Sequence, residues 1–171
     1  MSLRRLLFLF AIAAVAAGAL RLVAFEGIYI ASASMEPALP VGTHVLLDKI
    51  TFRFREPRRG EIIAFSAPVP PHEEMVKRVI AAGGDVVELR RKEVFVDGAL
   101  VEEPYARHTR PRERLRGDTM GPVEVPELHY FVLGDNRDES NDSTVWRDSD
   151  SGEPVRFVPR SRVRGILRGF Y

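Results

Sequence analysis

Cysteine is absent from the 171 residues of this chain. The absence excludes disulfide frameworks, cysteine-ligated zinc, iron–sulfur clusters and a catalytic thiol. Any nucleophile for covalent catalysis must therefore be a residue of another type. Because a chain without cysteine is stable in oxidising and reducing surroundings alike, the absence does not indicate a compartment.

A large excess of charge of either sign is also lacking. The chain has 25 Lys and Arg against 24 Asp and Glu, which gives a formal net charge of +1 at pH 7. Proteins that coat nucleic acids normally carry a strong basic excess. We therefore expect no nucleic-acid partner.

Helical periodicity, internal repeats and low-complexity tracts are missing beyond the first 25 residues. Short runs rich in Val, Ile and Phe are separated there by Gly, Pro and Asp, which is typical of antiparallel β-structure. Asp97-Gly98 between two such runs predicts a two-residue hairpin turn. The sequence thus predicts a mainly β, antiparallel, barrel-like domain. The expected strands are 27–31, 44–48, 61–66, 75–81, 86–90, 93–96 and 129–133.

One long hydrophobic run lies near the N-terminus. Of the 20 residues in 6–25, 18 are apolar, and only Gly18 and Arg21 interrupt them. About 20 apolar residues are needed for a helix to cross the hydrocarbon core of a bilayer, and Arg21 would then lie near the far interface. We expect residues 6–25 to be a transmembrane anchor.

The flanks of this run bear on its orientation. Arg4 and Arg5 favour a short cytoplasmic N-terminus over residues 1–5, because basic residues tend to stay on that side. The alternative is a cleavable signal peptide, since residues 31–33 read Ala-Ser-Ala. Those residues lie well past the end of the run, and the run is long for a signal peptide.

The remaining residues, 27–171, have the composition of an ordinary folded domain. Residues 102–128 are less patterned and contain five Arg, so we expect a surface insertion there. Residues 147–156 are a second irregular stretch. Residues 156–168 contain five Arg and no acid, which indicates either a solvated surface strand or a segment attracted to anionic lipid headgroups.

Ser34 follows the apolar run closely. Pro37 fixes its own φ and pushes Glu36 toward an extended conformation, so we expect Ser34 on a stiff, non-helical backbone near the membrane. A serine followed by Met and Pro is weak evidence for a nucleophile when taken alone. A residue at the junction of a strand and a turn is the simpler interpretation.

Lys77 and Arg78 are adjacent cations in a run of apolar residues. Neighbouring side chains of a strand point to opposite faces, so one of the two must be partly buried. Burial lowers the pKa of an ammonium group, and a lysine that is neutral near pH 7 can act as a general base. The alternative is a lysine on an edge strand that blocks aggregation.

Residues 134–143 hold many polar side chains directly after an apolar strand, as expected for a network that supports a site. A calcium loop starting at Asp135 is excluded, because Arg137 would fall at its third position and Ser140 where glycine is required. Residues 59–65 form another distinct segment, a turn that enters a buried strand. No metal site is predicted.

Two other kinds of hydrolase find little support. The chain has four histidines, but it contains no G-x-S-x-G nucleophile elbow, and none of the histidines lies in the segments above. The zinc peptidase motif H-E-x-x-H is absent, since His72-Glu73 is not followed by a second histidine at the required spacing.

Taken together and in this order, the segments resemble bacterial type I signal peptidase. The resemblance covers nearly the whole chain, and the last motif is long and specific. The matching motifs are Ser32-Ala33-Ser34-Met35-x-Pro, Arg59-Gly60-Glu61-Ile62, Lys77-Arg78-Val79-Ile80 with Gly84-Asp85, and Gly134-Asp135-Asn136-Arg137-Asp138-x-Ser140-x-Asp142-Ser143.

This resemblance implies a membrane-bound serine endopeptidase with a Ser–Lys dyad and an acyl-enzyme intermediate. Its substrates would be the signal peptides of exported preproteins, cut after small residues of the Ala-x-Ala type. Residues 27–171 would be the catalytic domain on the extracytoplasmic side of the cytoplasmic membrane, attached by a single span. The resemblance implies no metal and no cofactor, with membrane lipid as a further partner, and we expect a monomer.

The resemblance also assigns roles to individual residues. Ser34 matches the nucleophile and Lys77 the general base. The Ser32 hydroxyl and the Ser34 backbone N–H match the oxyanion hole. The supporting residues are Ser140, which would orient the lysine, and Asp135, Arg78 and Asp142, which would form a salt-bridge network.

The chain departs from the family pattern at three places. Thr144 stands where the family usually has an arginine that pairs with Asp142, residues 147–156 are additional, and Gly83 replaces a proline. Two alternatives therefore stay open. One is a specialised Ser–Lys processing peptidase with one dedicated substrate, and the other is an inactive, membrane-tethered binding module.

Overall fold

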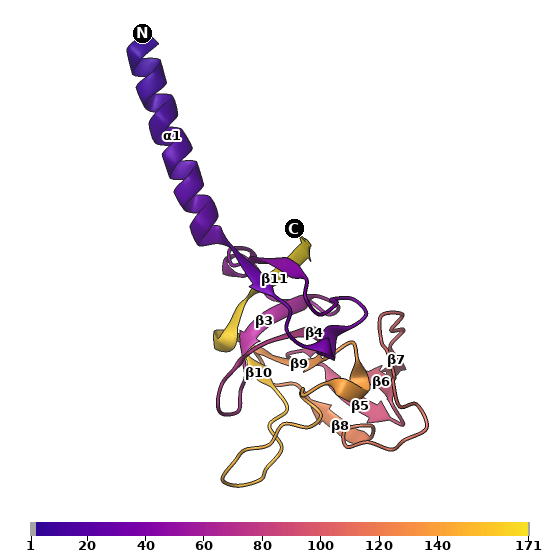
Figure 1. The fold of residues 1–171 in the computed structure, drawn as a ribbon. Coiled ribbons are helices and arrows are strands. Elements are labelled where there is room, and N and C mark those ends of the chain that lie inside the picture. The colour runs from indigo at the N-terminus through magenta and orange to yellow at the C-terminus, as the bar shows by residue number, and fades with distance from the viewer. Residues whose placement is uncertain (1–2, 171) are drawn as a thin grey trace.

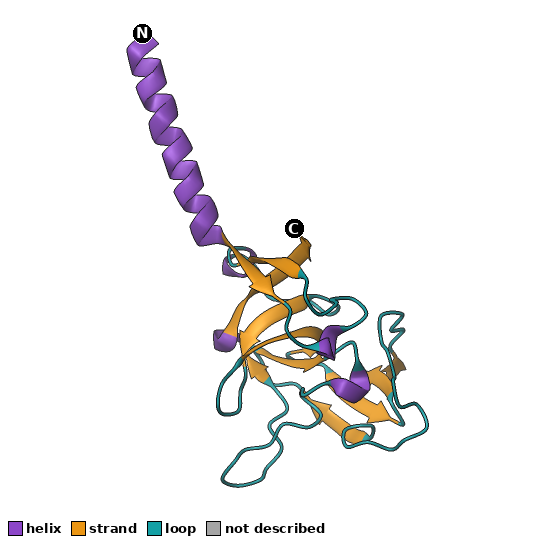
Figure 2. Ribbon diagram, in the orientation of Figure 1, coloured by secondary structure: helices purple, strands orange, loops and turns teal. Residues whose placement is uncertain are grey.

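A computed structural model describes residues 3–170 of the chain (Figure 1). One long helix precedes a β-domain whose strands are joined by loops and single 3₁₀ turns (Figure 2). The elements are α1 (Leu3–Ala24), β1 (Phe25–Tyr29), η1 (Ala33–Met35), β2 (His44–Asp48), η2 (Thr51–Arg53), β3 (Ile62–Ser66), β4 (Glu74–Ala82), β5 (Val86–Arg90), β6 (Glu93–Val96), β7 (Ala99–Leu100), β8 (Met120–Glu124), β9 (His129–Leu133), η3 (Arg137–Glu139), β10 (Val158–Pro159), η4 (Arg160–Arg162) and β11 (Val163–Phe170).

Helix α1 extends away from the β-domain and leads directly into β1 (Figure 1). It covers the predicted apolar segment except for Phe25, which begins the first strand. The side chains from Leu6 to Phe10 are each at least 50% exposed. Among the described residues, no helix combines the length and the apolar character that crossing a membrane requires.

The β-domain consists of two antiparallel sheets. The larger has seven strands in the order β1-β2-β11-β3-β4-β9-β10, and the smaller has four in the order β7-β6-β5-β8. The mainly β, antiparallel prediction is confirmed. The larger sheet is an open half-barrel with β1 and β10 at its edges, rather than a closed barrel.

The predicted hairpin at Asp97-Gly98 is present between β6 and β7. Both residues have positive φ, 54° and 78°, as a two-residue hairpin turn requires. The predicted surface insertion over 102–128 is wrong in one part, because it contains strand β8 of the smaller sheet. The expectation of a solvated strand in residues 156–168 holds only in part. Strand β11 lies between β2 and β3 and buries Gly165 and Ile166, whereas Arg164 and Arg168 are exposed.

Three apolar clusters stabilise this arrangement. One lies between the smaller sheet and one face of β4 and β9, and a second covers the opposite face around Phe65, Val79 and Trp146. The third is small and lies beneath η1, and it consists of Ile30, Met35, Leu39 and Val45. The turn that carries Ser34 is therefore fixed to the edge of the larger sheet by its own core.

Candidate active site

Ser34 lies in the 3₁₀ turn η1, just after β1. Ser32 precedes the turn in an extended conformation, and its Oγ accepts a hydrogen bond from the Ser34 N–H at 3.2 Å. This cap satisfies a free N–H at the start of the turn. Glu36 is extended before Pro37, as predicted, but the expectation of a non-helical backbone at Ser34 itself is wrong.

Lys77 approaches Ser34 from β4, although 43 residues separate the two in sequence. Its Nζ donates a hydrogen bond to Ser34 Oγ at 2.7 Å and another to the Val76 carbonyl at 3.1 Å. Antiparallel pairing of β4 with β3 sets Lys77 opposite Ile63. The serine and the amine are thus within the reach that proton transfer requires.

Burial favours the neutral form of the Lys77 amine, which is the form that a general base needs. Its side chain is only 4% exposed, and Ser34 is 6% exposed. Desolvation lowers the pKa of Lys77 from 10.5 to about 8, although the negative charges of Asp142 and Asp135 oppose the shift. A substantial fraction of the amine is therefore uncharged slightly above neutral pH.

The loop after β9 holds the Ser34 turn in place. The Asn136 N–H donates to the Ser34 carbonyl at 3.1 Å, and Asn136 Nδ2 donates to the Ala33 carbonyl at 3.2 Å. Gly134 passes so close that a Cβ there would lie 2.5 Å from the Ser34 carbonyl oxygen. A glycine is thus required at this position, because any side chain would displace the turn that carries Ser34.

Arg78 points to the opposite face of β4 and pairs with Asp135. Its Nε and Nη2 donate to the two carboxylate oxygens at 2.8 Å and 2.5 Å, and its Nη1 donates to the Gly60 carbonyl. The guanidinium also stacks on Tyr105, 3.9 Å from the ring centroid. Burial opposes ionisation of Arg78, but the Asp135 hydrogen bonds raise its pKa above the usual value. The pair fixes β4 to the loop that holds Ser34.

Comparison with known proteins identifies the family. The family model described as signal peptidase, peptidase S26, matches residues 3–171. The chain belongs to this family. It is 37% identical to a probable signal peptidase I-2 from Synechocystis, over 82% of this chain and 60% of that protein. It is 32% identical to a signal peptidase I from Pseudomonas fluorescens, over 82% of this chain and 62% of that protein.

A solved structure agrees with this assignment. The crystal structure of a signal peptidase I from Enterococcus faecalis matches with a TM-score of 0.51 and 30% identity, covering 67% of this chain and 98% of that chain. The chain spans about 60% of the length of the two relatives described above.

Thr144 occupies the position at which the signal peptidase pattern usually has arginine. The carboxylate of Asp142 accepts hydrogen bonds from the Thr144 N–H at 3.1 Å, from Thr144 Oγ1 at 2.8 Å and from the Gly134 N–H at 3.1 Å. The salt bridge is therefore replaced by neutral donors, and Asp142 keeps its place beside the dyad.

Ser140 lies next to Gly134, but its predicted bond to the lysine is not formed. Its Oγ is buried and has no hydrogen-bond partner among the described residues, and the Val76 carbonyl accepts from Lys77 instead. Its orienting role stays a prediction. The predicted oxyanion donors do lie together, since the exposed Ser32 hydroxyl is bonded to the Ser34 N–H.

A cleft of about 440 Å³ opens above the dyad. It runs between residues 28–32 at the end of β1 and residues 73–77 at the start of β4, and Ser34 and Lys77 line it. Its walls are largely apolar near Ile30 and Met75. Such a cleft fits an extended chain with small apolar side chains.

The sequence pattern did not single out two residues of this site. Asn136 and Gly134 belong to the motif of residues 134–143. The Ser34 turn that they contact lies about 100 residues earlier in the sequence, so no local pattern indicates these contacts. Only their position in the shared motif could have indicated a role. The hydrogen bond that Ser34 Oγ accepts comes from Lys77 and not from a histidine.

Proposed function

We propose that this chain is a serine endopeptidase that removes signal peptides from exported preproteins. The observation that carries the proposal is the 2.7 Å contact between the buried amine of Lys77 and the hydroxyl of Ser34. A lysine held in apolar surroundings is a suitable base for a serine nucleophile, and no imidazole is required.

The reaction begins when neutral Lys77 takes the proton of the Ser34 hydroxyl. Ser34 Oγ then bonds to the scissile carbonyl carbon, and the carbonyl electrons move to its oxygen. When the peptide C–N bond breaks, the Lys77 ammonium returns the proton to the leaving amine and an ester to Ser34 remains. Water then attacks this ester while Lys77 accepts its proton, which restores the serine.

The negative oxygen of the intermediate would lie beside the Ser34 N–H and the Ser32 hydroxyl. In the free protein the hydroxyl accepts from that N–H, so a substrate carbonyl must take its place as acceptor. Removal of one such donor typically costs about 10²–10³-fold in rate. Ser32→Ala is expected to lower kcat in this range.

Substrate would enter the 440 Å³ cleft as an extended strand between β1 and β4. Alternate side chains of such a strand point into the cleft, which favours small residues before the cut, as in Ala-x-Ala. The proposal extends to the monomer as the active form, since both dyad residues come from one chain.

We further propose that residues 6–25 attach the domain to the cytoplasmic membrane as a single span. Residues 1–5 would lie in the cytoplasm and residues 27–171 outside. Five consecutive exposed apolar side chains, Leu6–Phe10, point to every side of this part of α1, and a helical stretch that is apolar all round suits lipid better than a membrane surface. The 22 residues of α1 extend about 33 Å.

Cleavage of an Ala-x-Ala preprotein by the full-length protein in lipid vesicles tests the activity. Ser34→Ala and Lys77→Ala are each expected to lower kcat/KM by at least about 10³-fold. Lys49→Ala, which removes a partly exposed lysine, is the control and should keep wild-type activity. Cleavage that survives in both dyad variants would refute the proposal, and binding without turnover by the wild type would favour an inactive binding module.

A further inference from the structure

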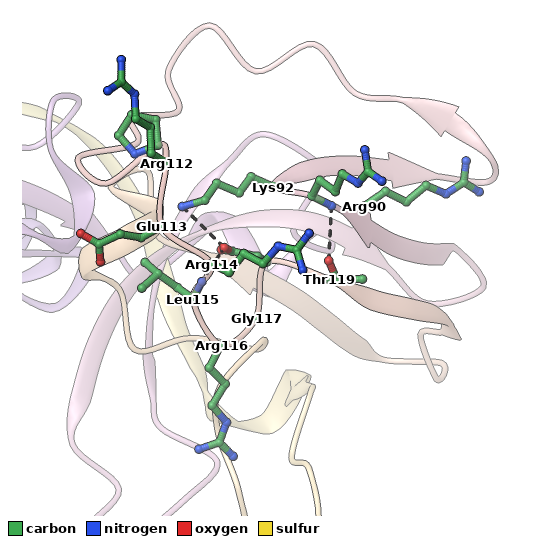
Figure 3. Close-up of a pocket in the computed structure, with 12 residues that line it drawn as sticks. Arg90, Lys92, Arg112, Glu113, Arg114, Leu115, Arg116, Gly117 and Thr119 are labelled. Atoms are coloured by element: carbon green, nitrogen blue, oxygen red, sulfur yellow. Dashed lines mark hydrogen bonds and ion pairs between the residues drawn. The ribbon is translucent and has the colours of Figure 1, made fainter.

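A second, larger cleft lies away from the dyad, at the smaller sheet. It has a volume of about 750 Å³ and is formed by the turn between β5 and β6 together with residues 111–119 (Figure 3). Six cationic side chains line it, against two acidic ones, Glu113 and Asp118. The cations are Arg90, Arg91, Lys92, Arg112, Arg114 and Arg116.

Most of these cations lack a carboxylate partner. Within residues 3–170, Arg91, Arg112, Arg114 and Arg116 form no ion pair, and all four are exposed. Figure 3 shows the side chains of Arg112 and Arg116 extending in opposite directions from the segment that carries both. Because unpaired charges of one sign around a concave surface concentrate the electrostatic potential there, the cleft attracts anions.

The turn that carries two of these cations is strained. Arg91 and Lys92 have positive φ, 51° and 75°, and they are the two central residues of the β5–β6 hairpin. The two central residues of the β6–β7 hairpin, Asp97 and Gly98, also have positive φ, and Asp-Gly is a preferred sequence for such a turn. A side chain other than Gly, Asn or Asp costs about 1–2 kcal/mol in this conformation. Arg91 and Lys92 thus occupy a backbone conformation that disfavours their side chains.

The cleft is connected to the loop that supports the dyad. Lys92 Nζ donates to the buried carboxylate of Asp138 in η3 at 2.6 Å. Gly117 packs on Thr144 so closely that a Cβ would lie 2.5 Å from Thr144 Oγ1. A large side chain at position 144, such as the arginine of the family pattern, would displace this wall of the cleft.

We propose that this cleft binds an acidic segment of the preprotein on the C-terminal side of the scissile bond. The inference rests on the proposed function. The smaller sheet lies at the end of the domain away from α1 (Figure 1), so the chain that leaves the membrane and passes the dyad reaches it last. The same position argues against lipid headgroups as the ligand. Acidic preproteins would be the preferred substrates.

Full-length protein in neutral-lipid vesicles and paired preprotein substrates test this inference. The substrates share one signal peptide and cut site and differ only in a block of four Asp or four Asn, placed at increasing distance after the cut. At low salt we expect the acidic block to raise kcat/KM by about threefold to tenfold, mainly through KM, because each solvent-exposed ion pair contributes little. The gain should fall as salt is added.

Arg112→Ala/Arg114→Ala should abolish the acidic preference and leave cleavage of the Asn substrate unchanged. Arg53→Ala/Arg58→Ala removes the same charge elsewhere and is the matched control, which should keep the preference. Arg112→Glu/Arg114→Glu should reverse the preference, so that the Asn substrate is cut faster than the Asp substrate. These two arginine pairs are exposed, so the variants are expected to fold.

Three outcomes would overturn the inference while the proposed function stands. The first is equal cleavage of both substrates by the wild type. The second is an acidic preference that survives in Arg112→Glu/Arg114→Glu. The third is a loss of binding to anionic vesicles in that variant without a change in its substrate preference. Failure of the wild type to cut even the Asn substrate would instead refute the proposed function.

Discussion

Burial of the Lys77 amine lowers the stability of the free protein, and the same burial favours the neutral amine that the proposed mechanism requires. The folded pKa of about 8 lies below the ordinary value of 10.5. Between these values the unfolded chain binds more protons than the folded chain, so the free energy of unfolding rises with pH across this window. Below pH 8 the protein bears the full cost of a buried cation.

Lys77→Met should therefore stabilise the protein at pH 7 while abolishing activity. We expect the free energy of unfolding to rise by roughly 1–3 kcal/mol, because each pKa unit corresponds to about 1.4 kcal/mol. Urea denaturation of the full-length protein in detergent measures this change. Lys49→Met, at a partly exposed lysine, should change the value by less than about 1 kcal/mol. A strongly destabilised Lys77→Met variant would contradict the account.

Gly134 is a second residue at which the addition of one atom, a Cβ, is expected to lower activity. A Cβ at this residue would collide with the Ser34 carbonyl oxygen and with Ser140. We expect Gly134→Ala to lower kcat by about 10²-fold or more, because a misplacement of about 1 Å at the nucleophile has an effect of this size. Gly121→Ala is the matched control, since a Cβ there meets no atom within 4 Å. Equal activity of the two variants would refute the positioning of Ser34 by this loop.

At the scale of elements, the Arg78–Asp135 ion pair joins β4 to the loop after β9. The Asp135 side chain is 1% exposed and that of Arg78 is 12% exposed, so removal of one charge leaves the other without a partner. Asp135→Asn should lower the free energy of unfolding by about 3–5 kcal/mol. Asp97→Asn, in the exposed pair with Arg59, should leave the urea midpoint almost unchanged. Similar midpoints for the two variants would contradict this role.

Strands with regular alternation could be predicted from the sequence, and strands without it could not. The runs around β2, β3 and β5 are rich in Val, Ile and Leu and were predicted to within one residue. Strand β8 contains Gly121 and Pro122, which a sheet tolerates at an edge, where β8 lies. Strand β8 forms because it pairs with β5, so the local sequence pattern did not predict it.

The position of β11 depends on the whole sheet. Arg164, Arg168 and two glycines interrupt its apolar pattern, which indicated a surface location. Gly165 is required instead for close packing against Asp48 of β2. Family motifs indicated Ser34 and Lys77, which the structure brings into contact. The contacts of Asn136 with the Ser34 turn join segments that are distant in sequence, so no local pattern indicated them.

At the scale of the whole molecule, the proposed arrangement places α1 in the membrane and the β-domain in water on its outer side. The full-length protein should remain with membranes after alkaline carbonate extraction, and its β-domain should be digested by protease added to the outer face. Leu9→Lys/Ile12→Lys should release it, because a charge at the centre of a span costs about 2.5–3.5 kcal/mol. Leu9→Ile/Ile12→Val is the control. Release of the wild type by carbonate would contradict the proposed span.

Catalysis in the proposed mechanism depends most on a neutral Lys77 that accepts the proton of Ser34. The pH dependence of kcat/KM for the full-length protein on an Ala-x-Ala preprotein, from pH 6 to pH 10, tests this most directly. The profile should rise about tenfold per pH unit and level off above about 8, following the pKa of Lys77. A flat profile, or one that levels off near pH 6.5 as an imidazole would, contradicts the account.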